Sequence, residues 1–366
     1  MRTKTHYVKC LAWLFGAVLS ALIFISCEMM RENRDDCPIG LYLNFKYDYN
    51  LERANMFSDH VGAVDVLVFD ENGKYVTTQS EVNDGDYRPL ASPAYAMHMN
   101  LMPGKYKFIV LAGQTSYDNQ LQSERARFVR TALKSGDDMA DLDIVLDTKG
   151  SGNVLLVDNK GLPLDTLWHG MAIEPIEVFA EKPTYHTVSL MRDTKKINVT
   201  LREIDDPTTM DIDNYEMTIT DRNSRLLWDN SVDETNRVVY TPHATWNTDD
   251  RVPAFDVNGH PLEEVGKIAH ADFMTSRIIY HDNAADDGIL SVVNKLTGLE
   301  VIRVNLPDLL SRLRTSEEIH IYSPQEFLDR GYDYQVDFFL KGDRLAYVNI
   351  SISILGWSKR VQYEEL

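Results

Sequence analysis

Leu41-Tyr-Leu-Asn-Phe-Lys-Tyr-Asp-Tyr49 is the stretch that decides the fold. Apolar and aromatic residues occupy every second position from Leu41, and Asn44, Lys46 and Asp48 lie between them. Alternation with a period of two is typical of a β-strand that has one buried and one exposed face. The folded part of the chain therefore opens with a half-buried strand, whose pairing partners must lie further along the sequence.

Similar strands follow at short intervals. Residues 61–69 are apolar at nearly every position, which predicts an interior strand of a packed sheet. Asp70-Glu-Asn-Gly73 then predicts a hairpin turn, because Asn and Gly tolerate positive φ, and residues 75–78 return as its partner. Pro103-Gly104 precedes another alternating strand.

The second half of the chain repeats this pattern. Alternating strands are predicted at 196–202, 215–220, 299–306, 334–340 and 348–354. Asp221-Arg-Asn-Ser224 predicts a hairpin between the strand 215–220 and a strand beginning at Arg225. Many short strands with few helices predict a mainly β fold of two tandem β-sandwiches. We place the first sandwich at residues 38–170 and the second at 171–366, because Pro and Gly are frequent between Gly161 and Pro183.

Three segments have the spacing of short helices. Apolar residues between Leu121 and Leu133 recur near helical intervals, and Gly136 would end that helix. A second helix is predicted by an i, i+3, i+4, i+7 set of leucines, with Pro at the first helical position; the set is Leu306, Leu309, Leu310 and Leu313. Ser323-Pro-Gln-Glu326 is a capping-box pattern and predicts a third helix that stops near Gly331.

Upstream of these elements, an apolar run over residues 11–26 follows Arg2, Lys4 and Lys9 and ends at Cys27. This pattern predicts a secretion signal over residues 1–26. A membrane-spanning helix would need about twenty apolar residues, and the run falls short. Secretion without lipid would need a small-x-small cleavage site, which the residues before Cys27 do not provide. The pattern resembles a bacterial lipobox, so we expect lipid on Cys27 and a short tether over residues 27–37.

Composition limits the function. Removal of residues 1–26 leaves 340 residues, with 34 basic against 56 acidic residues and a net charge of −22. Such an acidic protein is a poor partner for nucleic acid, which is bound through basic surface. Cys37 would be the one unmodified cysteine of the exported chain, so no intramolecular disulfide can form and stability must come from burial.

Candidate catalytic and ligand-binding groups are weak. The sequence has no nucleophile elbow, zinc-binding histidine pair or phosphate-binding glycine loop. His169 lies near Asp165 and Glu174, but no nucleophile accompanies it, so a structural or solvent-facing histidine is favoured. We therefore predict no enzyme activity, no cofactor and no metal.

Two acidic stretches could in principle hold calcium, but acidic turns are favoured for both; they are residues 282–288 and the group Asp205, Asp206, Asp211 and Asp213. Several aromatic residues could form a carbohydrate platform, although core or rim positions are favoured; they are Tyr42, Tyr47, Tyr49, Trp228, Trp246 and Trp357.

The order of these features resembles the fimbrillin-associated anchor family, the lipoprotein anchor subunits of Bacteroidales-type fimbriae. The resemblance runs through nearly the whole chain and is carried by Cys27, Asp36-Cys-Pro38, the strand 41–47, Val66-Leu-Val-Phe-Asp-Glu-Asn-Gly73, Pro103-Gly-Lys-Tyr106, Leu167-Trp-His-Gly170, Ser189-Leu-Met-Arg192, Lys196-Ile-Asn-Val-Thr-Leu201, Pro324-Gln-Glu-Phe-Leu-Asp-Arg330 and Ile354-Leu-Gly-Trp357.

This resemblance implies two transthyretin-like β-sandwiches and attachment to the outer membrane through the lipid. It also implies a role at the base of a surface fimbria, where the protein would anchor the fibre and limit its length. The expected partners are pilins of the same system, joined by exchange of a donor strand. The alternative hypothesis is a lipid-tethered surface module that binds a glycan or a host protein. The C-terminal strand 347–355 could be a donor strand or an integral strand of the second sandwich.

Overall fold

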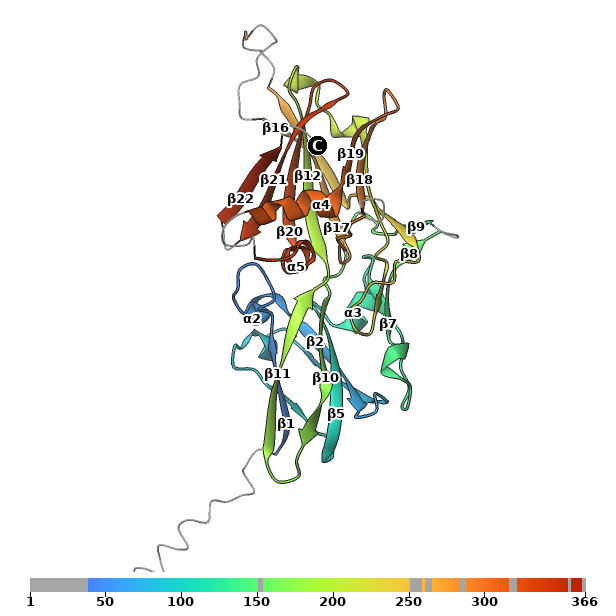
Figure 1. The fold of residues 1–366 in the computed structure, drawn as a ribbon, viewed down its shortest axis with the longest axis vertical. Coiled ribbons are helices and arrows are strands. Elements are labelled where there is room, and N and C mark those ends of the chain that lie inside the picture. Colours follow the sequence, from blue (N-terminus) through green and yellow to red (C-terminus); the bar gives the residue numbers. More distant parts are fainter. Residues whose placement is uncertain are drawn as a thin grey trace, which may run out of the picture.

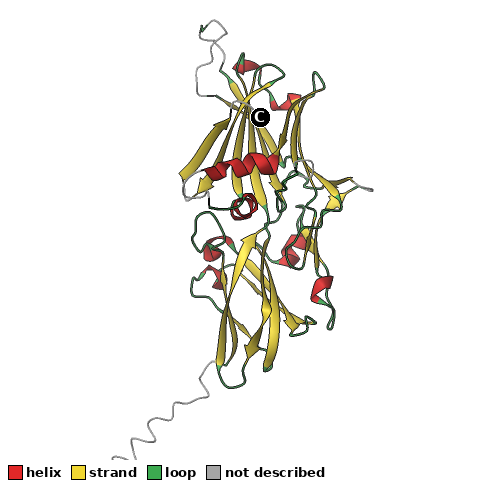
Figure 2. Cartoon of the chain, in the orientation of Figure 1, coloured by secondary structure: helices red, strands yellow, loops and turns green. Residues whose placement is uncertain are grey.

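The computed structural model describes residues 39–150, 154–250, 259–260, 265–283, 288–315, 321–354 and 357–363. This part of the chain is mainly β and forms two units stacked along the long axis of the molecule (Figures 1 and 2). The predicted fold class, a mainly β protein of two sandwich units with a few short helices, is confirmed. The α-helices of the described part are α2 (Phe57–His60), α3 (Tyr117–Gln122), α4 (Leu306–Ser311) and α5 (Pro324–Arg330).

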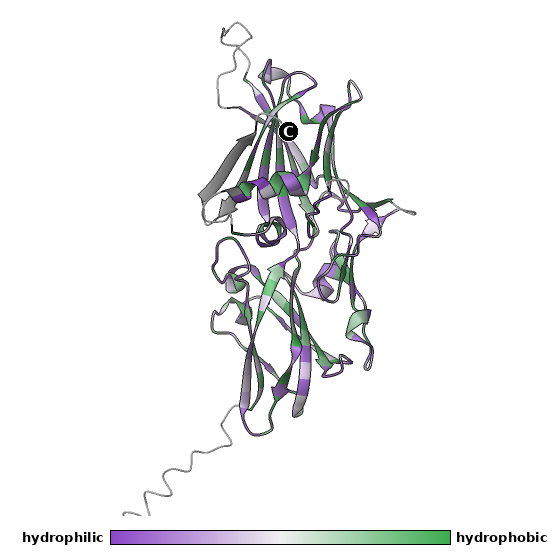
Figure 3. Ribbon diagram, in the orientation of Figure 1, coloured by the Kyte–Doolittle hydropathy of each residue, from purple (hydrophilic) through white to green (hydrophobic). Residues whose placement is uncertain are grey.

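The first unit is a curled seven-stranded sheet. In spatial order its strands are β3 (Tyr75–Val82), β2 (Ala63–Asp70), β5 (Gly104–Gly113), β10 (Trp168–Val178), β11 (Pro183–Arg192), β1 (Gly40–Lys46) and β4 (Met97–Met99). Strand β1 runs parallel to β11, and the other neighbours are antiparallel. Alternate residues of these strands face one buried core, including Leu43, Val66 and Phe108. Figure 3 shows the resulting bands of hydrophobic and hydrophilic residues along the strands.

The second unit consists of two facing six-stranded sheets. The first contains β16 (Ala244–Asp249), β17 (Lys267–Thr275), β12 (Lys195–Glu203), β20 (Asp333–Leu340), β21 (Leu345–Ile354) and β22 (Trp357–Tyr363). The other contains β19 (Leu299–Asn305), β18 (Ile289–Asn294), β13 (Tyr215–Asp221), β15 (Arg237–Tyr240), β9 (Val154–Val157) and β8 (Thr148–Lys149). The predicted leucine helix is confirmed as α4, whose residues Leu306, Leu309 and Leu310 are buried in the hydrophobic core; Leu313 is also buried but lies in the 3-10 turn that follows α4.

A small third layer lies beside both units. Strands β14 (Arg225–Leu227), β7 (Asp143–Leu146) and β6 (Phe128–Arg130) form a three-stranded sheet. One continuous hydrophobic cluster includes Leu67 and Ile109 of the first unit, Ile144 of this small sheet and Val336 of the second unit. The two units therefore share a core in addition to the chain that joins them.

The expected division at residues 170 and 171 does not follow the sheets. Strand β10 spans that position and pairs with β5 and β11, so both β10 and β11 belong to the first unit. Strand β9 comes before the expected boundary but pairs with β15 in the second unit. Strands β8 and β9 precede β10 and β11 but belong to the second unit, so the chain passes between the units more than once, and its last passage is at Asp193–Thr194, where β11 gives way to β12.

Two predictions of local structure were wrong. The expected helix over 121–133 is replaced by α3, which ends at Gln122, and by β6, which pairs with β7. The expected hairpin at 221–224 does not form, because β14 pairs with β7 while β13 pairs with β15 and β18. In both cases burial against a distant strand decided the local conformation, since Phe128 and Leu226 are fully or almost fully buried.

Other predictions are confirmed. Asp70 accepts hydrogen bonds at Oδ1 from the backbone N–H groups of Asn72 and Lys74, and Gly73 has a φ of +80°, so the β2–β3 turn has the expected chemistry. Ser323 caps α5 through its Oγ, which accepts from the N–H of Glu326 at 3.1 Å.

Within the described residues, no helix has the length and apolar character required to cross a membrane.

Candidate functional site

Strand β1 is the described element nearest to the predicted lipid site, and it is fully seated in the first unit. All seven residues of β1 pair in register with β11, from Gly40 opposite Pro183 to Lys46 opposite Ser189, and residues 41–43 also pair with β4. Leu41 and Leu43 are completely buried. Because β11 runs toward the second unit, Gly40 lies at the pole of the molecule farthest from that unit (Figure 1).

The loop after β1 contacts the second unit directly. Asn50 is buried and holds this loop by donating from Nδ2 to the carbonyl oxygens of Tyr47 and Ala54. The Nε of Arg53 donates to the hydroxyl of Tyr322 at 3.1 Å. The guanidinium of Arg330 in α5 lies 4.1 Å from the ring centroid of Tyr49. The first strand is therefore coupled to the second unit as well as to its own sheet.

A buried polar joint connects β11 to β12. The joint consists of Arg192, Asp193, Thr194 and Lys195, each at most 3% exposed. The ammonium group of Lys195 donates to the carbonyl oxygens of Arg192, Asp329 and Gly331 at 3.2, 2.9 and 2.8 Å. Burial lowers the pKa of Lys195 and raises the pKa of Asp193. A lysine that donates three hydrogen bonds to carbonyl groups has every N–H satisfied.

Two further contacts fix the joint. Arg277 donates from Nε and Nη2 to the two carboxylate oxygens of Asp329 at 2.8 and 2.9 Å, and both side chains are largely buried. The guanidinium of Arg192 lies 4.3 Å from the ring centroid of Tyr332 and 5.5 Å from that of Trp168. Bidentate and stacked arginines have a defined geometry, so the joint favours one relative orientation of the two units.

The edges of the sheets are protected to different degrees. In the first unit the edge strands β3 and β4 are bridged by side chains, because Gln79 donates to the carbonyl of His98 at 2.8 Å and Tyr95 donates to Glu81 at 3.1 Å. In the second unit β16 and β22 are edge strands of the first six-stranded sheet. An edge strand presents main-chain donors and acceptors to an added strand.

The C-terminal candidate donor strand lies inside this structure. Strand β21 pairs with β20 on one side and with β22 on the other, and Ile350 and Ile352 are buried. Within this molecule it is thus an integral strand of the second unit.

The predicted site residues fall in several places. Cys27, Cys37, the predicted signal over 1–26 and residues 284–287 of one acidic loop lie outside the described residues. Asp206 and Asp211 accept hydrogen bonds from the backbone N–H groups of Thr208 and Asp213, as turn caps do. Among the residues that the structure describes, no group of three or more His, Cys, Asp or Glu side chains could hold a metal ion.

His169 is a buried histidine of β10. Its Nε2 lies 3.0 Å from the carbonyl oxygen of Trp228, and burial lowers its pKa to about 4. Asp165 instead accepts from the hydroxyl of Ser123 at 3.4 Å. The neutral imidazole therefore links the first unit to the segment after β14. The buried joint at 192–195 has no signature in the sequence, because the groups that contact it come from separate stretches of the chain.

The fold and these contacts define an elongated protein in which two β-sandwich units are packed end to end. The chain belongs to the family of fimbrillin-A associated anchor proteins Mfa1 and Mfa2, whose family model matches residues 34–363. The resemblance seen in the sequence is thereby confirmed. No curated protein matches the chain at a significant level of sequence similarity.

Solved structures agree with this family. A candidate adhesin from Bacteroides thetaiotaomicron is 28% identical with a TM-score of 0.70, covering 89% of this chain and 98% of its own. A candidate polysaccharide-binding protein from the same species is 26% identical with a TM-score of 0.68, covering 89% and 99%. The fimbrial anchor protein Mfa2 from Porphyromonas gingivalis shares the fold at 17% identity, with a TM-score of 0.56 and coverage of 88% and 99%.

Proposed function

We propose that this protein is the lipid-anchored base subunit of a cell-surface fimbria. It attaches the fibre to the outer membrane through lipid on Cys27, limits the length of the fibre through donor-strand-type contacts with a pilin, and catalyses no reaction. The observation that carries the proposal is the seating of β1, in which Leu41 and Leu43 are wholly buried between β11 and β4. A subunit that keeps its first strand in place also keeps whatever is attached to that strand.

The geometry of β1 suits a mechanical attachment. Residues 28–38 separate Cys27 from the described fold, and eleven residues can span at most about 40 Å. The hydrogen bonds of a β-ladder run roughly across the strands. A force applied along β1 from Gly40 therefore loads the bonds to β11 together rather than one after another, and the loop after β1 passes it to Tyr322 and α5.

The partner surface is proposed at the second unit. This unit lies at the opposite pole from Gly40, and its edge strands β16 and β22 could accept or supply a strand in pairing with a pilin. Strand β16 is largely exposed along its length. This arrangement would place the membrane at one end of the molecule and the fibre at the other.

Substitution of the lipid site tests the anchor. We expect Cys27→Ser to release the protein, with its attached fibres, into the culture medium, because several acyl chains are needed for stable membrane attachment. Cys37→Ser is the matched control and should leave the fibres on the cells. Fractionation, lipidation mass spectrometry and electron microscopy provide the readout. Unchanged membrane-bound fibres on cells with the Cys27→Ser protein would refute the anchor role.

The control of length needs its own measurement. Cells that lack the protein should carry or shed fibres with a longer mean length than cells that express it, because the terminating subunit is absent. Electron micrographs of both strains give the two length distributions. Equal distributions would remove length control from the proposed function and leave anchoring untouched.

A second candidate function is binding at the cell surface. Two similar structures are described as a candidate adhesin and a candidate polysaccharide-binding protein. A base subunit and a binding module are compatible in one chain, because they use different surfaces. The specific observation in favour of binding is a pocket between strands β2 and β3 of the first unit and the segment around β6.

A further inference from the structure

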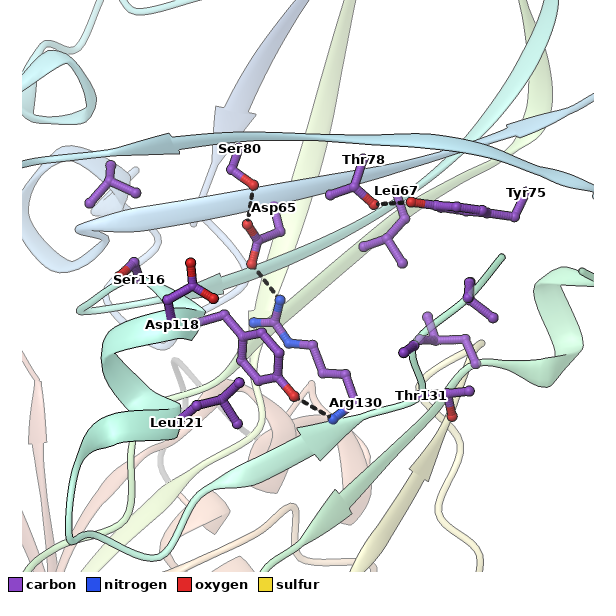
Figure 4. Close-up of a pocket in the computed structure, with 15 residues that line it drawn as sticks. Asp65, Leu67, Tyr75, Thr78, Ser80, Ser116, Asp118, Leu121, Arg130 and Thr131 are labelled. Atoms are coloured by element: carbon purple, nitrogen blue, oxygen red, sulfur yellow. Dashed lines mark hydrogen bonds and ion pairs between the residues drawn. The ribbon is translucent and has the colours of Figure 1, made fainter. Parts of the chain in front are cut away.

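A pocket of about 500 Å³ lies on the outer side of β2 and β3, where α3 and the segment around β6 approach them (Figure 4). Its polar walls come from β2, β3, α3 and β6, and its apolar floor includes Leu67 and Leu142. Small-molecule sites typically have volumes of about 300–1,000 Å³ and combine apolar walls with a few placed polar groups. This pocket has both properties.

Arg130 is the fixed centre of the pocket. Its Nη1 donates to Oδ2 of Asp65, and its guanidinium lies 4.2 Å from the ring centroid of Tyr117. The hydroxyl oxygen of Tyr117 in turn accepts from the backbone N–H of Arg130 at 2.9 Å. The side chain of Arg130 is 10% exposed, so its position is set by the protein before any ligand arrives.

Hydroxyl groups line the wall formed by β3. The hydroxyls of Tyr75 and Thr78 are 2.7 Å apart, and Ser80 donates to Oδ1 of Asp65 at 2.5 Å (Figure 4). Thr78 and Ser80 are exposed. Hydroxyls can donate and accept, and each of these retains hydrogen-bonding capacity for a ligand. Across the pocket, Ser116 and Asp118 of the α3 region add a further hydroxyl and an exposed carboxylate.

The charge of the lining selects against ionic ligands. Asp65 already pairs with Arg130, which leaves Asp118 as the other charged group of the lining. An anionic ligand would meet this carboxylate in a protein that is already strongly acidic. A cationic ligand would gain little from it, because Asp118 is exposed and an exposed ion pair contributes at most about 1 kcal/mol. A neutral ligand with many hydroxyl groups and an apolar face matches the lining, because it can pair with the hydroxyls while it covers Leu67, Leu121 and the Tyr75 ring.

We propose that this pocket binds a neutral pyranose sugar, with Thr78, Ser80 and Asp118 pairing with its hydroxyl groups. The proposal gives a location to the second candidate function and does not depend on anchoring. If no sugar binds the pocket, the result of the fibre-release experiment still stands. If the Cys27→Ser protein does not release fibres, the sugar-binding proposal still stands.

The test uses the mature chain, residues 27–366, with Cys27→Ser to keep it in solution. The probes are the methyl glycosides of galactose, mannose and N-acetylglucosamine, with glucuronate and glucosamine as charged probes. Saturation-transfer NMR detects binding, and calorimetric titration measures affinity. We expect at least one neutral glycoside to bind, and to bind more tightly than either charged sugar.

Variants tie the binding to the pocket. Ala132→Trp should abolish binding, because Ala132 is exposed on the wall of the pocket and an indole would fill it. Thr78→Val should weaken binding about fivefold through loss of one hydrogen bond. Thr77→Val is the matched control, since Thr77 is exposed but does not line the pocket, and should bind like the parent. Circular dichroism verifies folding of each variant. Tighter binding of a charged sugar, no binding of any neutral glycoside, or binding that survives Ala132→Trp would overturn the proposal.

Discussion

Lys195 shows how a single buried charge can define the relation between two units. Its three acceptors belong to β11, α5 and the residue after α5, so one ammonium group ties three positions of the backbone together. An apolar side chain at this position would leave three carbonyl groups buried without donors, at a cost of about 1–3 kcal/mol each. Lys195 therefore specifies an orientation that hydrophobic burial alone would fix less closely.

His169 makes stability depend on pH at the residue scale. The folded state lowers the pKa of His169 from 6.5 to about 4 through burial, so the unfolded chain binds more protons between these two values. The free energy of unfolding should consequently fall as the pH drops from 6.5 toward 4, by about 3 kcal/mol from this group. We expect His169→Gln to remove most of that pH dependence, because an amide does not titrate in this pH range. The Gln amide can still donate a hydrogen bond to the carbonyl of Trp228, so the contact is kept.

Urea unfolding at pH 7 and pH 4.5 measures the effect. The parent should lose about 2–3 kcal/mol more than His169→Gln between the two conditions. His98→Gln, at an exposed histidine, should keep the dependence of the parent. A loss of the same size in the parent and in His169→Gln would show that another group controls acid stability.

The residues of the joint could not have been found from the sequence. Lys196 is exposed, as the alternation of the strand 196–202 predicts, but nothing in the neighbouring Lys195 indicated complete burial. Two of its three acceptors lie more than one hundred residues away along the chain, and backbone carbonyls leave no trace in the side-chain pattern. The lipid site contrasts with the joint, because Cys27 was predicted from the sequence pattern and lies outside the residues that the structure describes.

At the scale of elements, α5 offers an internal comparison between a buried and a partly exposed ion pair. Asp329 pairs with Arg277 beside the joint, whereas Glu326 pairs with Arg330 at 3.0 Å nearer the surface. We expect Asp329→Ala to reduce the free energy of unfolding by about 3–5 kcal/mol, because Arg277 would be left buried and unpaired. Glu326→Ala should cost less than about 1 kcal/mol. Chemical denaturation measures the loss in free energy of unfolding for each variant. Equal losses would mean that the buried ion pair of Asp329 and Arg277 contributes no more than a surface contact.

Elements with strong local signals could be predicted, and elements defined by distant partners could not. Helix α4 and helix α5 have leucine spacing or a capping serine in their own sequence, and both formed. Strand β6 has only three residues, of which Phe128 is buried and Val129 is 41% exposed, so its helical spacing was misleading. Its pairing with β7 depends on a contact that the local pattern does not encode.

At the scale of the molecule, the division into two sandwiches could be predicted, but the position of the division could not. Prolines and glycines between Gly161 and Pro183 indicated a linker, and several of them instead lie within or beside β10 and β11. Both strands are long and pair on either side within the first unit. The passage from β11 to β12 at Asp193–Thr194 is short, buried and polar, which is unlike the exposed linkers that composition reveals.

The shared core predicts that the two units unfold together. Leu67, Ile109 and Ile144 belong to the same hydrophobic cluster as Val336 and Ile350, so separation of the units would expose apolar surface on both. We expect one calorimetric transition with equal calorimetric and van't Hoff enthalpies, although multidomain proteins commonly deviate from two-state behaviour. Val66→Ala, in the separate inner core of the first unit, should remove about 2 kcal/mol and lower this single transition as a whole. Two resolved transitions, of which Val66→Ala moves one, would show that the units are independent and that force applied to β1 need not be resisted by the whole molecule.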